Sequence, residues 1–178
     1  MAHQSQWRLG LAKLADDLAV WDGLSVQQMK SVYARWHEQP AFLSQLLNSL
    51  KSLSLQAGAT WLLKHHLTQG ATLDARSTSA LCRELSELKD WPAQLHALQM
   101  LDKLNLSEAD LDPVESFARE GLRAENKFVR AWSYHAMYLV SLQRPELQEE
   151  VSGLFERAMQ QEAASVKARL RQILKDRP

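Results

Sequence analysis

The chain has 178 residues, of which 46% are hydrophobic and 24% charged, a composition typical of one globular domain. Six Gly and five Pro are too few for the many turns of an all-β sandwich or barrel, so the composition favours helices. The 21 Lys and Arg residues balance 21 Asp and Glu, which argues against a strongly basic nucleic-acid-binding protein, and the single cysteine excludes an internal disulfide.

The first forty residues contain the pattern of two helices and the start of a third. Residues 7–20 carry apolar side chains three and four positions apart, and the pattern stops before Gly23. A capping-box sequence beginning at Ser25 starts the second helix, which we expect to run to about Glu38. Pro40 then ends this helix and opens the third, because proline is tolerated in the first turn of a helix.

The rest of the chain shows only helical periodicity, and no segment alternates with the period of a strand. Asp112 and Pro113 mark one start clearly, because an N-cap residue and a first-turn proline precede Glu115. The predicted helices from residue 55 onward end at Gly70, cover Leu81–Leu88, begin at Trp91, and then span Val114–Arg123, Asn126–Leu142, Pro145–Gln160 and Ser165–Lys175.

These helices fall into pairs with a regular spacing. The second members begin near residues 55, 91, 127 and 163, an interval of about 36, which is typical of a helical solenoid. Residues 128–131 (Phe-Val-Arg-Ala) match residues 165–168 (Ser-Val-Lys-Ala) in the next pair. The predicted inward stripes of these two helices are Val129, Ser133, Ala136, Met137 and Val140 in the first, and Val166, Leu170, Ile173 and Leu174 in the second. An irregular helical bundle is the competing all-α architecture, and the near-constant interval argues against it.

At these residues the chain resembles the HEAT-repeat (armadillo-like) family. The second helix of that family tends to read Val-Arg followed by small and apolar residues, as in Val129–Arg130 with Ala136–Met137 and in Val166–Lys167 with Ile173–Leu174. The resemblance is good over residues 110–177, fair over 40–105 and absent before 40. In the family the basic residue ties neighbouring repeats through an acidic partner, which implies structural roles for Arg130 and Lys167.

The resemblance implies an all-α fold, a right-handed α-α superhelix of about four HEAT-like helix pairs in a single domain, 1–178. Residues 1–38 would form an amino-terminal helical cap, and the pairs would occupy residues 40–70, 76–104, 113–142 and 145–175. Successive second helices would then leave a concave face open to solvent.

Two tyrosines are the first candidates for that concave face. Tyr134 and Tyr138 lie five and nine residues after Val129, on the side of the helix opposite its apolar stripe. A further helix or the amino-terminal arm that covered this side would bury both. The same offsets in the other repeats complete a predicted partner-binding row of Lys64, His96, Tyr134, Tyr138, Arg171 and Lys175, with Thr60 and Met100 as intervening members.

The sequence offers no catalytic constellation, cofactor motif or metal site. Phosphate-binding glycine motifs and a nucleophile elbow are absent from the 178 residues. His65 and His66 are adjacent, so on a helix their rings diverge by about 100° and cannot readily share a metal. Cys82 lies among leucines without a neighbouring histidine, so we expect a buried thiol rather than a nucleophile. We therefore expect no catalytic residue, cofactor or metal.

We accordingly expect a non-enzymatic module that binds a protein or peptide through its concave face. The chain begins without a signal-peptide pattern and contains no apolar run of the ~20 residues that span a bilayer, which predicts a cytoplasmic protein with no membrane partner. The pattern leaves an end-to-end homodimer open, because the tail after Lys175 is too short to cover the last repeat.

The alternative is a nucleic-acid-binding protein, because some HEAT-like proteins are DNA glycosylases for alkylated bases. That resemblance implies phosphate contacts from Arg171 and Lys175 and a lesion facing Trp61, Tyr134 or Trp132, but no position matches the family's catalytic acid. Residues 119–178 carry a net charge of +3 and residues 74–118 a net charge of −5. A neutral total disfavours duplex DNA as the partner.

Overall fold

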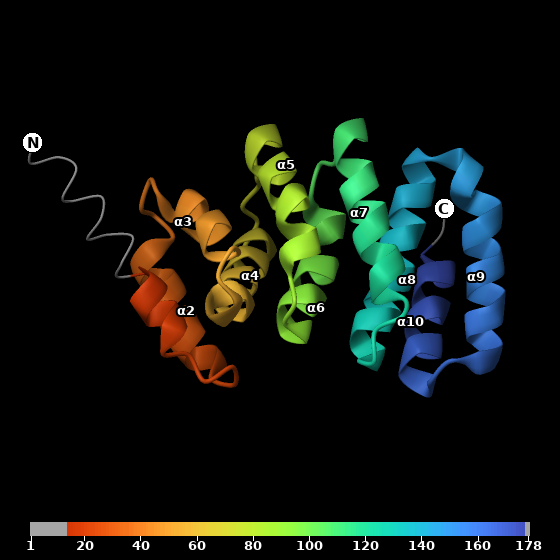
Figure 1. Cartoon of the computed structure of the whole chain (residues 1–178), viewed down its shortest axis with the longest axis horizontal. Coiled ribbons are helices and arrows are strands. Elements are labelled where there is room, and N and C mark those ends of the chain that lie inside the picture. Colours follow the sequence, from red (N-terminus) through yellow and green to blue (C-terminus); the bar gives the residue numbers. More distant parts are fainter. Residues whose placement is uncertain (1–13, 177–178) are drawn as a thin grey trace, which may run out of the picture.

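The computed structural model describes residues 14–176, and this part of the chain consists of helices and connecting turns without a strand (Figure 1). Residues 14–19 are helical, so the first predicted helix is seen only in its second half, and residues 1–13 of the predicted cap lie outside the described range. The α-helices are α2 (Val26–Trp36), α3 (Phe42–Ser49), α4 (Leu53–Thr68), α5 (Ala75–Glu84), α6 (Trp91–Met100), α7 (Glu108–Gly121), α8 (Lys127–Gln143), α9 (Gln148–Gln161) and α10 (Ala164–Lys175). Short 3-10 turns η1 (Leu85–Glu87), η2 (Leu101–Lys103) and η3 (Pro145–Leu147) extend three of the connections.

Side-chain caps start several of these helices, and those at Ser25 and Asn126 lie where the sequence indicated a helix start. The Ser25 hydroxyl accepts a hydrogen bond from the backbone N–H of Gln28, and the Asp74 carboxylate accepts one from Ser77. The Asn126 side chain does the same at the start of α8, where it accepts from the N–H of Phe128. These bonds satisfy backbone donors that have no partner within the helix, so each start is a local property of the sequence.

The start predicted at Asp112–Pro113 is wrong, because α7 begins at Glu108. The Asp110 carboxylate accepts from the backbone N–H of Ser107 at 2.9 Å and from its hydroxyl at 2.6 Å, and this capping box opens the helix one turn and a half earlier. Pro113 therefore lies inside α7 and gives up one helical hydrogen bond. Asp110 and Leu111 are buried, so the additional turn is held by packing as well as by its cap.

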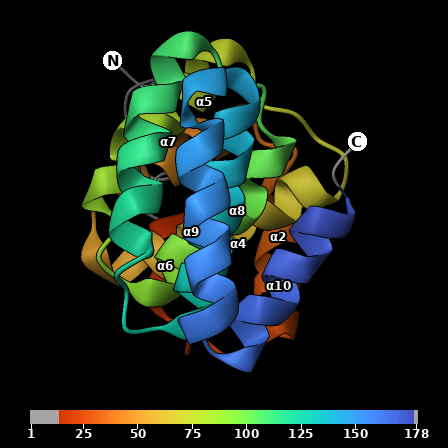
Figure 2. The same cartoon turned by 90° about the vertical axis from the view of Figure 1, so that its right-hand side faces the viewer.

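The helices form two adjoining rows. Helices α4, α6, α8 and α10 pack side by side in that order, and α3, α5 and α7 pack in the same manner. In three of the four predicted pairs the two members pack together: α3 contacts α4, α7 contacts α8, and α9 contacts α10 (Figure 1). Seen end-on, α7 and α10 lie on opposite sides of α9 (Figure 2). Helices α4, α6, α8 and α10 begin at residues 53, 91, 127 and 164, which confirms the predicted starts to within two residues.

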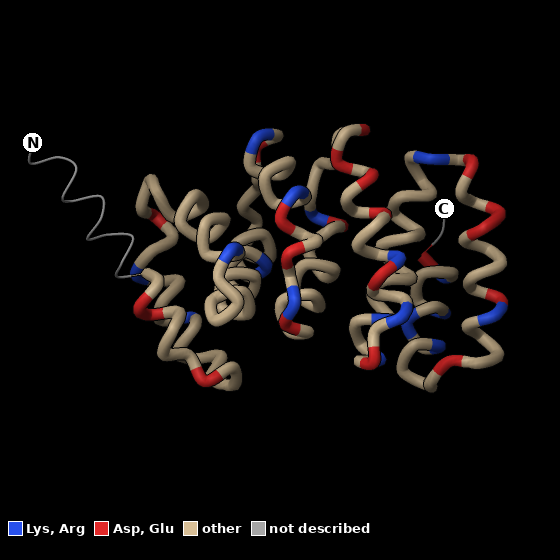
Figure 3. The backbone as a smooth tube through the Cα atoms, in the orientation of Figure 1, with Lys and Arg blue, Asp and Glu red and all other residues tan. Residues whose placement is uncertain are grey.

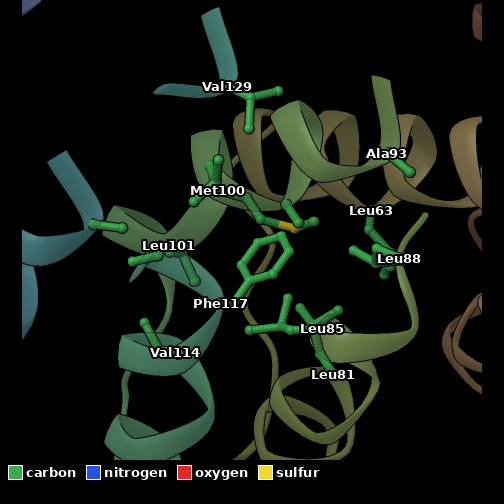
Figure 4. Packing of buried hydrophobic residues seen from close by; sticks show 14 of the residues in the cluster. Leu63, Leu81, Leu85, Leu88, Ala93, Met100, Leu101, Val114, Phe117 and Val129 are labelled. Atoms are coloured by element: carbon green, nitrogen blue, oxygen red, sulfur yellow. The ribbon is translucent and has the colours of Figure 1, made fainter. Parts of the chain in front are cut away.

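A continuous apolar core lies between the two rows. In Figure 4 the ring of Phe117 from α7 lies among Met100, Leu101 and Leu85. Met100 ends α6, Leu101 begins η2 and Leu85 begins η1. The inward stripe predicted for α8 is confirmed, since Val129, Ser133, Ala136, Met137 and Val140 are all 0–1% exposed. Packing of such apolar stripes supplies most of the stability of helices of this length.

Two expectations at the edges of this core have different outcomes. Cys82 is 1% exposed, so the expectation of a buried thiol is confirmed, and burial raises the pKa of this thiol to about 12. Leu174 was expected on the inward stripe of the last helix, yet it is 40% exposed. No further described helix packs beyond α9 and α10, so that side of α10 remains uncovered.

Candidate binding surface

The expectation that Tyr134 lies on an exposed face is wrong. Its side chain is 8% exposed and its ring meets that of Phe155 in α9 edge-to-face, with 6.0 Å between ring centres. Thr60 and Met100 are also fully buried. The physical reason is the number of neighbours, because α8 packs against α6, α7, α9 and α10 and retains little open circumference.

The other predicted residues do not share one surface. Tyr138 is half-buried on α8, whereas Arg171 and Lys175 are exposed on α10. Lys64 and His96 come together where α4 meets α6, and both are half-buried there. Arg171 follows Arg169 by two positions, which is about 200° around the helix, so it lies on the side of α10 away from the contact between Arg169 and α8.

The contact between α4 and α6 is built from polar side chains. The Lys64 ammonium donates to the Gln99 side-chain oxygen at 2.9 Å, and Nδ1 of His96 lies 3.2 Å from the Thr60 hydroxyl. Because the Thr60 hydroxyl donates to the Gln56 carbonyl at 2.8 Å, the ring nitrogen of His96 is the donor in this pair. Burial is the main cause that lowers the pKa of His96 to about 3, and the Lys64 charge adds to it. His96 is therefore neutral at pH 7.

The contact between α8 and α10 also contains a cation and a histidine ring. The sequence pattern did not indicate these residues as a binding group. The guanidinium carbon of Arg169 lies 3.6 Å from the ring centre of Trp132, and Nη2 donates to Nδ1 of His135 at 2.8 Å. Arginine can only donate, so Nδ1 of His135 accepts. Burial and then the charge of Arg169 lower the pKa of His135 to about 4, so this ring is also neutral at pH 7.

One side of α6 and the following turn connects the two contacts. His96 and Gln99 are three residues apart and lie on the same side of α6, and Asp102 follows three residues later in η2. Gln99 contacts Lys64, whereas the charge of Asp102 acts on His135 and Arg169. We call the connected set the cross-helix row, consisting of Trp61, Lys64, His96, Gln99, Trp132, His135 and Arg169.

Trp61 extends the row towards α2. Its ring is stacked on that of His65, with centres 4.8 Å apart, and His65 meets Tyr33 edge-to-face at 4.7 Å. The Tyr33 hydroxyl lies 3.0 Å from Nδ1 of His66, so a third pair of neighbouring helices is joined through a histidine. Burial is the main cause that lowers the pKa of both His65 and His66.

A sequence signal for the row does exist. The paired residues are 36 apart for Thr60 and His96, 35 for Lys64 and Gln99, and 34 for His135 and Arg169. These separations are close to the 36–38 residues between the starts of α4, α6, α8 and α10, because the contacts join neighbouring helices of this series. Comparing polar residues about 35 positions apart would have found these contacts, whereas a fixed offset from Val129 did not.

Ion pairs hold other parts of the molecule together. Arg130 bonds Glu162 through Nε at 2.9 Å, and it also donates to the carbonyls of Ala124 and Glu125. This observation confirms the structural role expected for Arg130. Lys167 donates to the Gln160 carbonyl at 3.1 Å. Basic and acidic residues gather around α7, α8 and α9 in Figure 3, where Arg144 pairs with Glu108, Asp112 and Glu115, and Arg119 pairs with Glu115 and Glu150.

A separate groove lies beside the start of α6. Trp91, which is 50% exposed, borders a hollow of about 650 Å³ together with Phe117, Arg123 and Glu125. It mixes one basic with several acidic and apolar side chains and has no polar pair like those of the cross-helix row. Trp91 therefore serves below as an exposed tryptophan outside the row.

Neither a protein-family model, nor a curated protein, nor a solved structure matches this chain. Within residues 14–176, no group of three His, Cys, Asp or Glu side chains is placed to hold a metal ion. None of the helices described is both long and apolar enough to cross a membrane.

Proposed function

We propose that this chain is a cytoplasmic, non-enzymatic helical-repeat module, a right-handed superhelix of HEAT-like pairs, that binds an extended peptide segment of a partner protein along the cross-helix row. The observation that supports this proposal best is that α4, α6, α8 and α10 pack side by side, with polar contacts between α4 and α6 and between α8 and α10. Each of these helices contributes half-buried ring or polar side chains, and repeat proteins use such extended surfaces for binding.

The dimensions of the row suit a short extended peptide. Neighbouring helix axes are about 8–10 Å apart, so the three steps from α4 to α10 span about 24–30 Å. An extended chain rises about 3.3 Å per residue, and the row therefore accommodates roughly seven to nine residues. Trp61 and Trp132 offer partly exposed rings near the two ends, where aromatic side chains contribute strongly to binding.

Selection from a displayed library of random ten-residue peptides tests the proposal. We expect peptides enriched on the wild-type chain to lose at least about tenfold in affinity when Trp61 or Trp132 is changed to alanine, because each ring supplies apolar contact area. The matched control is Trp91→Ala, which removes an exposed tryptophan outside the row. Peptides that respond to Trp91→Ala, or to none of the three variants, would contradict the proposed surface.

Nucleic-acid binding is the alternative function. The small number of cations in the row argues against it. Lys64 and Arg169 are the cations of the row, and Asp102 and Asp176 place negative charge near Arg169. Duplex DNA carries one negative charge per about 1.7 Å of its axis, so a groove for it needs several unopposed cations. Binding of labelled duplex DNA at low salt, abolished by Arg171→Gln with Lys175→Gln, would favour the alternative.

A further inference from the structure

We propose that the segment bound along the cross-helix row is acidic and that its carboxylates pair with Lys64 and Arg169. This inference rests on the proposed function and specifies the chemistry of the partner. It comes from a difference in acidic partners. The half-buried arginines elsewhere in the described chain form ion pairs, whereas Lys64 and Arg169 form none within residues 14–176.

Arg169 forms no ion pair within residues 14–176, unlike the other described arginines of similar burial. Within residues 14–176 four arginines are half-buried, and three of them, Arg119, Arg130 and Arg144, form ion pairs. Arg169 instead donates to a neutral ring, and its Nε is buried without a hydrogen-bond partner. Removing a guanidinium from water is costly unless an anion compensates its charge. An anion bound beside Arg169 would therefore offset that cost.

Lys64, at the other end of the row, also lacks an acidic partner among the described residues. Its ammonium bonds the neutral side chain of Gln99 and forms no ion pair among the described residues, and burial lowers its pKa. A carboxylate placed beside Lys64 would restore the favourable charge interaction that burial has weakened. Lys167 is the other half-buried lysine described, and it donates to a helix carbonyl and so has a structural role.

Carboxylates of a peptide suit this arrangement better than the phosphates of a nucleic acid. Lys64 and Arg169 lie on α4 and α10, with two helices between them, and Asp102 lies in the turn after α6. A peptide can place carboxylates near its two ends and neutral side chains beside Asp102. A phosphate backbone would place charge along the whole row and be repelled there. Trp132 adds an apolar surface beside Arg169 for the neighbouring peptide side chain.

The ten-residue peptide library also tests this inference. We expect the peptides that depend on Trp61 and Trp132 to be net acidic. Replacing their Glu and Asp residues by Gln and Asn should weaken binding at least about tenfold, because charge-assisted hydrogen bonds are lost. This peptide-side change leaves the protein intact, so its result does not depend on whether a variant folds.

Two protein variants of equal charge locate the effect. Lys64→Gln with Arg169→Gln and Arg171→Gln with Lys175→Gln each remove two positive charges, and circular dichroism verifies that both fold. Loss of at least about tenfold in the first and less than about twofold in the second supports the inference. The reverse pattern overturns it. Lys64→Gln alone, which leaves the contact of Arg169 with Trp132 in place, should still lose affinity.

The possible failures are distinguishable. Row-dependent peptides that are neutral or basic would overturn the acidic partner and leave the proposed function standing. Peptides that do not respond to Trp61→Ala or Trp132→Ala would remove the proposed function itself. If a single-stranded ten-nucleotide DNA bound the row more tightly than the acidic peptides, the partner would be a nucleic acid and the inference would be wrong.

Discussion

Acidification between pH 7 and pH 5 should destabilise this protein because folding buries neutral histidines. The pKa of His96 is about 3 in the folded chain, against 6.5 for an ordinary histidine. Below pH 6.5 the unfolded chain therefore binds a proton at this ring that the folded chain does not bind until about pH 3. The stability that the neutral ring contributes is fully present above pH 6.5 and is lost progressively as the pH falls from there.

The magnitude follows from the difference between the two pKa values. At pH 5 the unfolded ring is protonated and the folded ring is not, which lowers the free energy of unfolding by about 2 kcal/mol relative to pH 7. His135, with a pKa of about 4 in the folded chain, contributes a similar loss of about 2 kcal/mol over the same interval. The lowered pKa values of His65 and His66 act in the same direction.

Urea denaturation followed by circular dichroism at pH 7, 6 and 5, at constant ionic strength, measures this effect. We expect His96→Gln to remove about 2 kcal/mol from the fall in the free energy of unfolding between pH 7 and pH 5, because glutamine does not titrate. His135→Gln is the parallel variant, and the double variant should remove the sum of the two effects. A pH dependence of His96→Gln that coincides with that of the wild type would refute the reasoning.

Three further predictions concern single contacts, each measured as the free energy of unfolding in urea at pH 7. Gly121→Ala should lose about 1–3 kcal/mol, because a Cβ there would clash with the Ser133 hydroxyl. Adding Ser133→Ala should recover part of this loss, whereas an unchanged stability of Gly121→Ala would contradict the close approach. Glu162→Ala should lose about 2–4 kcal/mol because it leaves the 22% exposed Arg130 side chain without its anion, and a loss below about 0.5 kcal/mol would show that water replaces the pair. Asp110→Ala should lose about 1–2 kcal/mol through the cap of α7, with Asp112→Ala, a residue four-fifths exposed, as the comparison expected to lose less.

The helices could be predicted from the sequence because their signals are local. Ser25, Asp74 and Asn126 accept hydrogen bonds from backbone groups two or three residues ahead of them, and this geometry needs no other part of the chain. The start of α7 shows where the local signal is ambiguous. Two cap-like sequences lie close together, at Ser107 and at Asp112, and burial of Asp110 and Leu111 favours the first. That burial depends on neighbouring helices, which the sequence pattern does not specify.

The binding surface was harder to predict because exposure depends on every neighbour of a helix. The apolar stripe of α8 shows correctly which residues are most buried, and it says nothing of how many helices cover the remaining sides. Tyr134 lies opposite that stripe and is still buried, because α9 packs there with Phe155. Lys64 and His96, two members of the predicted row, lie where α4 packs against α6, whereas Trp132, His135 and Arg169 were not recognised as a group.

The sequence by itself determined that the described chain is helical, where most helices begin, and the interval of about 36 residues between the starts of α4, α6, α8 and α10. Capping bonds and apolar spacing act over one or two turns, so they can be read from neighbouring residues. Only the tertiary structure decided which polar side chains meet across helices and which half-buried cations form no ion pair within residues 14–176. Those properties depend on the packing of α4 with α6 and of α8 with α10, where a shift of one residue rotates a side chain by about 100°.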